Sequence, residues 1–400
     1  MRTERDKRRL SCPLSEFVVK DGYIFSFSWK YNCFFKIDIV SGEIVNRYVV
    51  KDYSANAYLL FRLVDAGDSV IAVPYTADCI LKWETQSEGF EKVDLPHSFS
   101  DKVVLRKFNA VALKEDKLFL FPADADCVCC YDFSMNKIKE VLNIRKCIYE
   151  NCQVRDPFLF ANGSHLINDT IYLGSWEWKT VNIISYDVNK NKVKITPIEG
   201  IDRGIRSICG EKNRIFALSG NGKLIMHDAE NSKMEVIKLC NEGDEDWWNI
   251  ISTHVVYYMG FVFAFAERIE LSKRVRILDG KIENIFDEHD IWQMKCGNAD
   301  TELFLGTFDH HQGKIYIYSS QGDIYWYDAV SGKKQGESRI KYDVDELAQW
   351  IRENAKSSSY MREDEFLYGL SDLFNILTKP RENLQQSEIN LGKAIYLHSI

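Results

Sequence analysis

The sequence lacks a basic excess and a long apolar run, and each absence excludes a class of protein. Its 51 Lys and Arg residues stand against 59 Asp and Glu residues, which gives a formal net charge of -8. A protein that binds duplex DNA or bulk RNA normally presents a basic face, so we expect no nucleic-acid partner. The best apolar stretch, 254–266, is too short to span a bilayer, and no apolar segment follows the basic residues 1–10. We therefore expect a cytoplasmic protein that does not contact membranes.

Local motifs for catalysis and cofactor binding are missing as well. There is no Gly-x-Ser-x-Gly elbow, no P-loop and no Gly-x-Gly-x-x-Gly run ahead of a helix. Cys127 and Cys129 fall on one face of a predicted strand and Cys130 on the other, so their thiolates would not converge on zinc. The run Asp309-His310-His311 falls in a predicted turn, where solvation explains it. We expect reduced thiols, no metal and no cofactor.

What the sequence does contain favours strands. Aromatic residues make up 13% of the chain, mostly Tyr and Phe, whereas there are only 7 prolines. Aromatic side chains fit the pleated, half-buried surface of a sheet. With 46% apolar residues the chain also has enough material for a sizeable core, so we expect an all-β fold.

A recurring pattern sets the predicted architecture. The run 73–80 (Val-Pro-Tyr-Thr-Ala-Asp-Cys-Ile) returns at 121–128 (Phe-Pro-Ala-Asp-Ala-Asp-Cys-Val), and 27–38 follows the same plan. Each copy leads to an acidic residue, and such an acid can be followed along the chain at Asp38, Glu84, Asp132, Asp187, Asp228, Asp279 and Asp328. The spacing of about 50 residues is the size of one four-stranded propeller blade.

The interior of each unit fits a blade. In the third unit, runs 110–113, 117–121, 127–133 and 137–144 alternate with short polar turns, as antiparallel strands do. We therefore predict a seven-bladed β-propeller over 16–340, preceded by a basic extension, 1–15, and followed by a helical tail, 341–400. Six blades remain an alternative because the fourth and sixth units are irregular. The main competing architecture is a two-sheet sandwich array.

In blade length and strand order the chain resembles the kelch-like and related β-propellers. The resemblance covers roughly Glu16 to Ile340, and it implies radial blades around a central funnel. The paired glycines of kelch repeats and the Trp-Asp signature of WD repeats are absent. The resemblance therefore implies the propeller fold and no particular subfamily.

The tail has helical rather than β periodicity. Asp343-Val344-Asp345 is typical of a helix start, and Leu347, Trp350 and Ile351 share one stripe. We expect these helices to pack on the propeller, with partner binding as the alternative. If the tail carries the function, removing residues after Tyr342 abolishes partner capture and leaves a soluble ring.

The candidate binding residues lie in loops that a propeller brings to one face. Connections after the second strand of a blade and connections between blades open on the same side, where loops vary over a rigid scaffold. Aromatic rings beside carboxylates suit sugar rings, and they also suit a cationic peptide. The candidates are Trp29, Tyr75, Trp176, Trp178, Asp244, Asp246, Trp247, Trp248, His289 and Trp292. The competing interpretation is that each Trp packs between blades. For the repeated Asp78 and Asp126 we expect a structural role, in which each carboxylate caps its own loop.

Two functions follow from this face. We favour a non-catalytic recognition or scaffold module that binds a protein partner or a carbohydrate-bearing ligand. The alternative is a lyase or hydrolase that acts on a glycan or peptide-like substrate. It would need His97, His254 and His289 to converge in the funnel with Arg155, Arg203 or Arg206. The sequence does not predict an oligomeric state.

Overall fold

The computed structural model describes most of the predicted propeller. The described residues are 17–28, 33–50, 60–86, 89–99, 106–152, 160–176, 180–240, 254–295, 301–343, 346, 347, 349, 350 and 353. The predicted extension 1–15 and nearly all of the tail lie outside them. Among the described residues, no helix is both long enough and apolar enough to cross a membrane.

Seven four-stranded antiparallel sheets follow one another along the chain, so the seven-bladed all-β prediction is confirmed and the six-bladed alternative is wrong. Blades 1 to 4 comprise β1 (Phe17–Lys20), β2 (Tyr23–Ser28), β3 (Cys33–Asp38), β4 (Ile44–Val49); β5 (Leu60–Asp65), β6 (Ser69–Pro74), β7 (Cys79–Glu84), β8 (Phe90–Asp94); β9 (Phe108–Lys114), β10 (Lys117–Pro122), β11 (Cys127–Asp132), β12 (Lys137–Asn143); and β13 (His165–Ile167), β14 (Thr170–Gly174), β15 (Asn182–Asp187), β16 (Lys192–Pro197). Blades 5 to 7 comprise β17 (Ile205–Glu211), β18 (Arg214–Ser219), β19 (Lys223–Asp228), β20 (Met234–Lys238); β21 (His254–Tyr258), β22 (Phe261–Phe265), β23 (Lys273–Arg276), β24 (Ile282–Asn284); and β25 (Leu303–Asp309), β26 (Lys314–Ser319), β27 (Asp323–Asp328), β28 (Lys334–Arg339).

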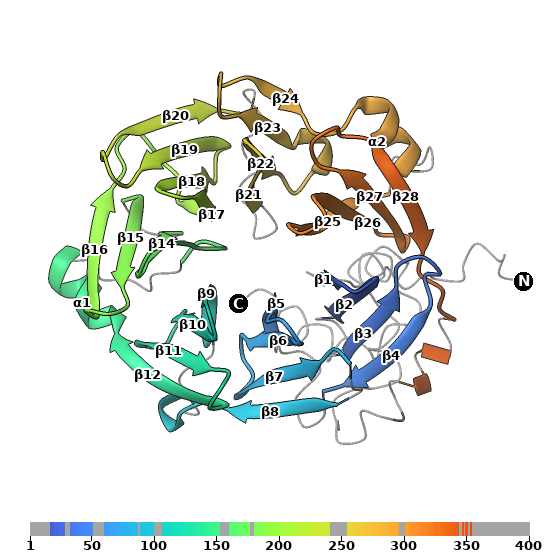
Figure 1. The fold of residues 1–400 in the computed structure, drawn as a ribbon, viewed down its shortest axis with the longest axis horizontal. Coiled ribbons are helices and arrows are strands. Elements are labelled where there is room, and N and C mark those ends of the chain that lie inside the picture. The colour runs from blue at the N-terminus through green and yellow to red at the C-terminus, as the bar shows by residue number, and fades with distance from the viewer. Residues whose placement is uncertain are drawn as a thin grey trace, which may run out of the picture. The chain divides into compact units, whose positions relative to one another are not determined.

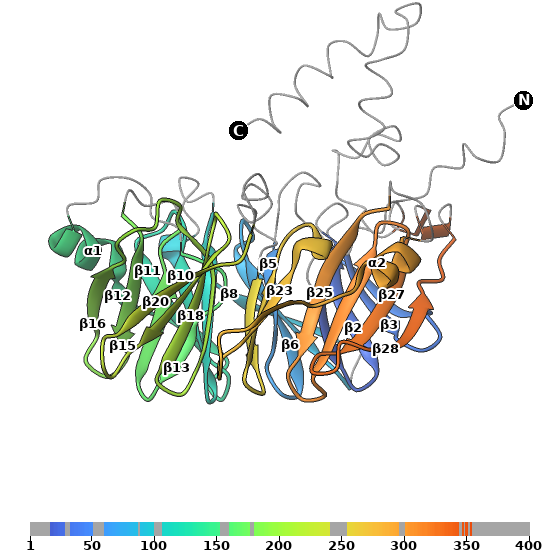
Figure 2. The same ribbon diagram turned by 90° about the horizontal axis from the view of Figure 1, so that it is seen from above.

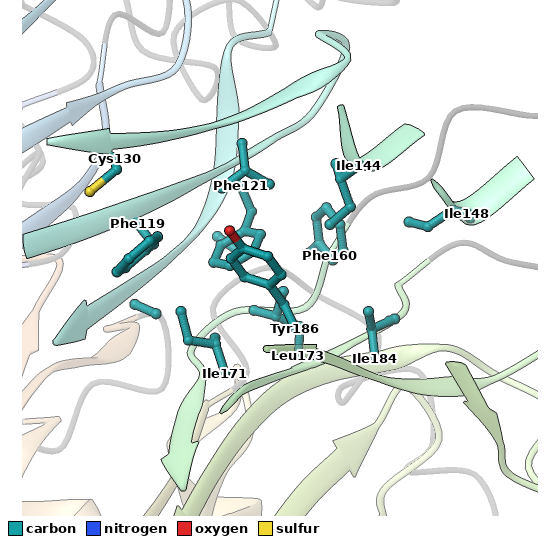
Figure 3. Packing of buried hydrophobic residues seen from close by; sticks show 13 residues of the cluster. Phe119, Phe121, Cys130, Ile144, Ile148, Phe160, Ile171, Leu173, Ile184 and Tyr186 are labelled. Carbon is teal, nitrogen blue, oxygen red and sulfur yellow. The ribbon is translucent and has the colours of Figure 1, made fainter. Parts of the chain in front are cut away.

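The blades stand around a common centre, with the first strand of each innermost and the fourth outermost (Figure 1). Each pair of neighbouring sheets buries apolar side chains between its facing surfaces. Between blades 3 and 4, for example, Phe119 and Phe121 of β10 pack against Tyr186 of β15, and the helix residues Ile144 and Ile148 cover the outer end (Figure 3). Alternate residues of one strand serve the two neighbouring junctions: in β11, Cys129 faces blade 2 and Cys130 faces blade 4. The core is therefore a ring of inter-blade layers.

The acidic residue that marked the repeat has a local structural role. In five blades its carboxylate accepts backbone N–H groups of the turn between the third and fourth strands, and these residues are Asp38, Asp132, Asp187, Asp228 and Asp328. Hydrogen bonds to the charged form hold the pKa of each of these carboxyls below its usual value. Such Asx turns explain why an acid recurs once per blade.

One assignment in that series needs correction. In blade 6 the position opposite the first residue of the second strand, Phe261, is occupied by Arg276, whereas Asp279 lies in the turn itself. In blade 1 the same position holds Asp38, opposite Tyr23. The sequence marker was therefore shifted in blade 6, because its third and fourth strands are short and its turn carries the acid instead.

These turns predict an acid-sensitive contribution to stability. A carboxyl whose pKa is lowered in the folded chain stabilises it above the unfolded value of about 3.9, and the contribution is lost as pH falls through the folded pKa. We expect the melting temperature to fall between pH 5 and pH 3. A variant with Asn at positions 38, 132, 187, 228 and 328 keeps the turn acceptor but cannot titrate, so its melting temperature should fall less steeply. Thermal unfolding across this pH range tests the idea, and parallel curves for the two proteins would contradict it.

The ring closes without a shared strand, because each sheet is built from four consecutive strands. On the inner side, the ring of Phe17 in β1 occupies the space that a side chain at Gly306 in β25 would fill, and it packs 5.9 Å from the ring of Tyr318. Gly306 lies at a register shift of β25, so a β-bulge leaves this gap open. We call this gap, filled by the aromatic ring of Phe17 beside Gly306, the glycine notch; it is part of the packing that closes the propeller on this side.

On the outer side, residues after the last strand hold blade 1. The Lys341 N–H donates to the Gly42 carbonyl oxygen at 2.8 Å. Asp343 accepts from the Glu346 N–H at 2.8 Å, as an N-cap does, and Glu346 pairs with Arg47 of β4 at 3.0 Å. The Arg47 guanidinium also lies 4.8 Å from the ring centre of Trp350. The first described turn of the tail thus fastens the closing junction.

Candidate ligand-binding face

The two faces of the propeller differ in the length of their connections. On one face, the turns between first and second strands and between third and fourth strands contain two to five residues. The connections between blades all reach the other face, and they include α1 (Ile144–Cys152), α2 (Glu288–Met294) and the 3-10 helix η2 (His97–Phe99). Figure 2 shows α1 and α2 at this same edge of the ring. We call it the loop face.

The structure does not gather the predicted site residues into one site. Six of them lie outside the described residues, namely Trp29, Trp178, Asp244, Asp246, Trp247 and Trp248. Of the other four, Tyr75 lies in a loop of blade 2 and Trp176 in a loop of blade 4. His289 and Trp292 lie on α2, between blades 6 and 7. The four are thus spread over three parts of the loop face.

Trp176 packs between blades, as the competing interpretation holds. It is 9% exposed and contacts Ala123 of the blade 3 loop, while the Arg206 guanidinium of β17 lies 4.6 Å from its ring. Gly204 makes this approach feasible, because a Cβ there would overlap the backbone carbonyl of Trp176. The indole therefore fixes the relative positions of blades 3, 4 and 5 through packing and a cation–π contact.

A chain of ion pairs, which sequence reasoning missed, crosses the loop face of blades 2 and 3. Arg106 makes a bidentate contact with Asp124, with a shortest distance of 2.7 Å, and this contact raises the pKa of the guanidinium. Lys107, which is buried, pairs with Asp78 at 3.2 Å, and Arg145 of α1 pairs with Asp126 at 3.1 Å. The partners come from different connections, so spacing in the sequence gave no signal for them.

This arrangement changes the interpretation of the repeated aspartates. We expected Asp78 and Asp126 to cap their own loops, but each pairs with a basic side chain of the following inter-blade connection. The Lys107 N–H also donates to the Tyr75 carbonyl oxygen at 2.5 Å, and the Asp124 N–H donates to the Arg106 carbonyl oxygen at 2.9 Å. Backbone and side-chain bonds together hold the connection between blades 2 and 3 in place.

The helix α2 presents the exposed indole of the described loop face. Asp287 caps it by accepting from the Asp290 N–H at 2.7 Å, and Met294 is buried, with its carbonyl oxygen accepting from the Tyr325 hydroxyl. Burial and the neighbouring Asp287 raise the pKa of the Asp290 carboxyl. Trp292 points away from this core and is 55% exposed, beside the exposed His289. Of the predicted aromatic residues that are described, Trp292 is exposed, whereas Tyr75 is half-buried and Trp176 is buried.

A polar belt lines the loop-face half of the inner wall. The Asn109 side-chain amide donates to the Phe160 carbonyl oxygen at 2.9 Å. Asn162 then exchanges two backbone bonds with blade 5: its N–H donates to Arg206, and its carbonyl accepts from Ile208, both at 2.8 Å. Further along, the Val255 N–H donates to the Ser207 hydroxyl at 3.0 Å. Blades 3 to 6 are therefore linked by hydrogen bonds as well as by apolar layers.

β-Bulges and a left-handed glycine orient the residues of this polar belt. Asn109 and Arg206 each lie at a β-bulge of an inner strand. At that point the residue has no partner on the neighbouring strand of its sheet. The left-handed Gly163, with φ +78°, bends the chain so that Asn162 leaves blade 4 and pairs with blade 5. No glycine marks the register shifts at Asn109 and Arg206, so the strand pattern did not predict this belt.

The groups required by an enzymatic site come from different blades and connections, although His254 and Arg206 lie on neighbouring inner strands that are joined by the bond from the Val255 N–H to the Ser207 hydroxyl. His97 follows an outer strand in η2, and His289 lies on α2 after the outer strand β24, whereas His254 begins the inner strand β21. Arg206 belongs to the inner strand β17, and Arg155 is outside the described residues. Over the part of the chain that is described, no group of three or more His, Cys, Asp or Glu side chains is placed to hold a metal ion. The Asp309-His310-His311 run is a turn on the face opposite the loops, closed by bonds from His311 and Gln312 N–H to the Asp309 carboxylate.

Comparison with known proteins identifies the architecture and no family. No protein-family model matches the chain, and no curated protein sequence matches it. Among solved structures, the computationally designed Ika8 protein is similar with a TM-score of 0.53 and 11% identity, over 82% of this chain and 87% of that one. AztD from Citrobacter koseri (TM-score 0.43, 14% identity, 82% and 86% covered) and BamB from Moraxella catarrhalis (0.43, 9%, 62% and 68%) are also similar. The first likeness supports the fold alone, and the chain is a seven-bladed β-propeller without an assigned subfamily.

Proposed function

We propose that the chain is a non-catalytic recognition propeller that binds a protein partner or a carbohydrate-bearing ligand on its loop face. The observation that carries this proposal is the asymmetry of the two faces. On one face the turns are short, and aspartate carboxylates accept their backbone N–H groups. On the other face lie the longer connections between blades. Variable loops over a rigid scaffold are the usual way in which a propeller presents a binding surface.

The chemistry of the loop face supports binding rather than catalysis. Its cations at Arg106, Lys107 and Arg145 are each paired with a carboxylate, and these pairs fix loops instead of leaving a reactive group. The connection between β20 and β21 contains Asp244, Asp246, Trp247 and Trp248, a composition suited to sugar rings or cationic side chains. Trp292, exposed on α2, provides aromatic surface on the described part of the loop face.

The enzymatic alternative is less well supported by the same geometry. It needs a His or Tyr within hydrogen-bond reach of a carboxylate in the funnel. His97 lies in the connection between blades 2 and 3 and His289 in the connection between blades 6 and 7, whereas His254 and Arg206 lie on the inner strands of blades 6 and 5. These groups are therefore spread over several blades. We therefore retain recognition as the function and expect no turnover of glycans or peptides.

Binding to defined ligands tests the proposal. The purified chain is applied to a glycan array and to a set of synthetic Lys- and Arg-rich peptides, and the dissociation constant of each hit is measured. Replacing Trp247 and Trp248 by Ala, or Trp292 by Ala, should weaken binding at least tenfold, because aromatic anchors carry most of the energy of such contacts (about 2 kcal/mol or more each).

The matched control is Leu278→Ala. Leu278 is 91% exposed, like a loop-face anchor, but it lies in the turn between β23 and β24 on the opposite face. Its loss should leave every dissociation constant unchanged. Equal effects of Leu278→Ala and the tryptophan variants would refute the loop-face assignment, and turnover of a hit glycan or peptide would favour the enzyme.

A further inference from the structure

Two histidines from neighbouring blades face each other's sheets across one junction. His165 begins β13 of blade 4, and His227 lies in β19 of blade 5. The neighbours of both in their own sheets, Tyr172 for His165 and Ile215 and Met234 for His227, belong to the apolar layer between blades 4 and 5. Both imidazoles therefore border the same inter-blade layer.

The surroundings of His165 disfavour its charged form. Its ring lies against Gly210 of β17, where a Cβ would overlap it, and its Nε2 atom is 2.8 Å from the Lys212 carbonyl oxygen. Burial lowers the pKa of the imidazole, and the Lys212 carbonyl and the Glu211 carboxylate oppose this shift without reversing it. The imidazole is thus kept neutral by its position between two inner strands.

The surroundings of His227 act in the same direction. The residue is 8% exposed, and its Nδ1 atom has no hydrogen-bond partner within the described structure. Burial lowers its pKa, Lys194 of the facing strand β16 lowers it further, and Asp228 and the Lys233 backbone raise it. A proton on this ring would add an unsatisfied donor and a charge beside Lys194.

We infer that the junction between blades 4 and 5 is an acid-sensitive latch, closed while His165 and His227 are neutral and loosened when they are protonated. The open junction gives both rings access to water, so it binds protons more strongly than the closed one. Closure is therefore fully favoured above the ordinary imidazole pKa of about 6.5 and weakens as pH falls below it.

Opening of the junction between blades 4 and 5 would also change the loop face. The same junction carries the bonds of Asn162 to β17 and the stacking of Arg206 on Trp176. Separation of blades 4 and 5 would break these contacts and move the connection that follows β16. The latch does not depend on what the loop face binds, since it is a property of the unliganded ring.

Hydrogen–deuterium exchange of the full chain at pH 7.5 and pH 5.5 tests the latch. After correction for intrinsic exchange rates, β17 (205–211) should lose protection by up to about tenfold for each imidazole, because pH 5.5 lies about one unit below the unfolded imidazole pKa. The internal reference is β6 (69–74) in blade 2, because the sequence contains no histidine before His97. Glu267 and Asp290, whose pKa values are raised, follow strands of blade 6 and do not border this junction.

Variants separate the latch from a general acid effect. In His165→Gln/His227→Gln the pH response of β17 should disappear, whereas His97→Gln, at an exposed position, should retain it. Equal loss of protection in β17 and β6 of the wild-type chain would overturn the inference, and so would a pH response that persists in the double variant. The wild-type comparison decides the matter even if the double variant does not fold.

Discussion

Replacing Gly163 by Ala should prevent stable closure of blades 4 and 5. Gly163 has φ +78°, and a Cβ there would overlap the backbone carbonyl oxygen of Ile208. The substitution adds the strain of a left-handed side-chain residue, about 1–2 kcal/mol, to a clash with backbone that cannot rotate away. It also displaces Asn162 from its two bonds with β17. We expect a loss of more than about 4 kcal/mol in the free energy of unfolding, measured by urea denaturation.

Gly200→Ala is the matched control for that experiment. Gly200 has φ +75°, nearly the same backbone conformation, but no atom lies within 4 Å of the added Cβ. It should cost only the conformational strain, about 1–2 kcal/mol. The difference between the two variants measures the close approach of blades 4 and 5. Similar losses for both would show that the inter-blade contact at Gly163 contributes little.

Replacing Gly306 by Ala should open the ring at its closing junction. The added Cβ would overlap the ring of Phe17, which is 2% exposed and has no free space to move into. Overpacking a close-packed site costs about 1–3 kcal/mol, and the cost here falls at the one junction that joins the two ends of the propeller. We expect a loss of about 3 kcal/mol by chemical denaturation, with exchange protection lost first in β1 and β25.

A double-mutant cycle separates this contact from a general loss of stability. Phe17→Ala alone leaves a cavity and should cost about 3–5 kcal/mol. Combined with Gly306→Ala, it removes the ring that the new methyl group meets, so the pair should cost at least about 1 kcal/mol less than the sum. Phe25→Ala, in the layer between blades 1 and 2, should be additive with Gly306→Ala. If the free-energy costs of Phe17→Ala and Gly306→Ala were simply additive, the Phe17 ring would not be the group that the added methyl meets.

The blades themselves could be predicted because their determinants are local. Strand alternation, two-residue turns and the aspartate that five of the blades carry at the third turn depend on neighbours within about ten residues, and they repeat with the blade. In the third unit the predicted runs differ from β9 to β12 by at most two residues at either end. The exception, Asp279, arose where blade 6 shortens its outer strands and puts Arg276 at the marker position.

The site could be predicted only as far as its face. The sequence placed Tyr75, Trp176 and Trp292 in connections that reach the loop face, and the structure places them there. It did not reveal that Trp176 is buried under Arg206, because the two residues belong to different blades and meet through a bulge in β17. Six of the ten predicted site residues, all aromatic or acidic, lie outside the described residues.

The sequence alone determined the repeat of about 50 residues, the order of strands within a blade and seven blades as the favoured number, since each rests on a pattern within one repeat. The structure decided between seven blades and six, and it showed what the turn aspartates bind. Only the tertiary structure decided which side chains meet across junctions: Asp78 with Lys107, Asn162 with β17, and Phe17 with Gly306. The physical reason is that these contacts depend on how neighbouring sheets are rotated against each other and where a bulge shifts the register. Neither quantity is encoded by the spacing of residues within a single blade.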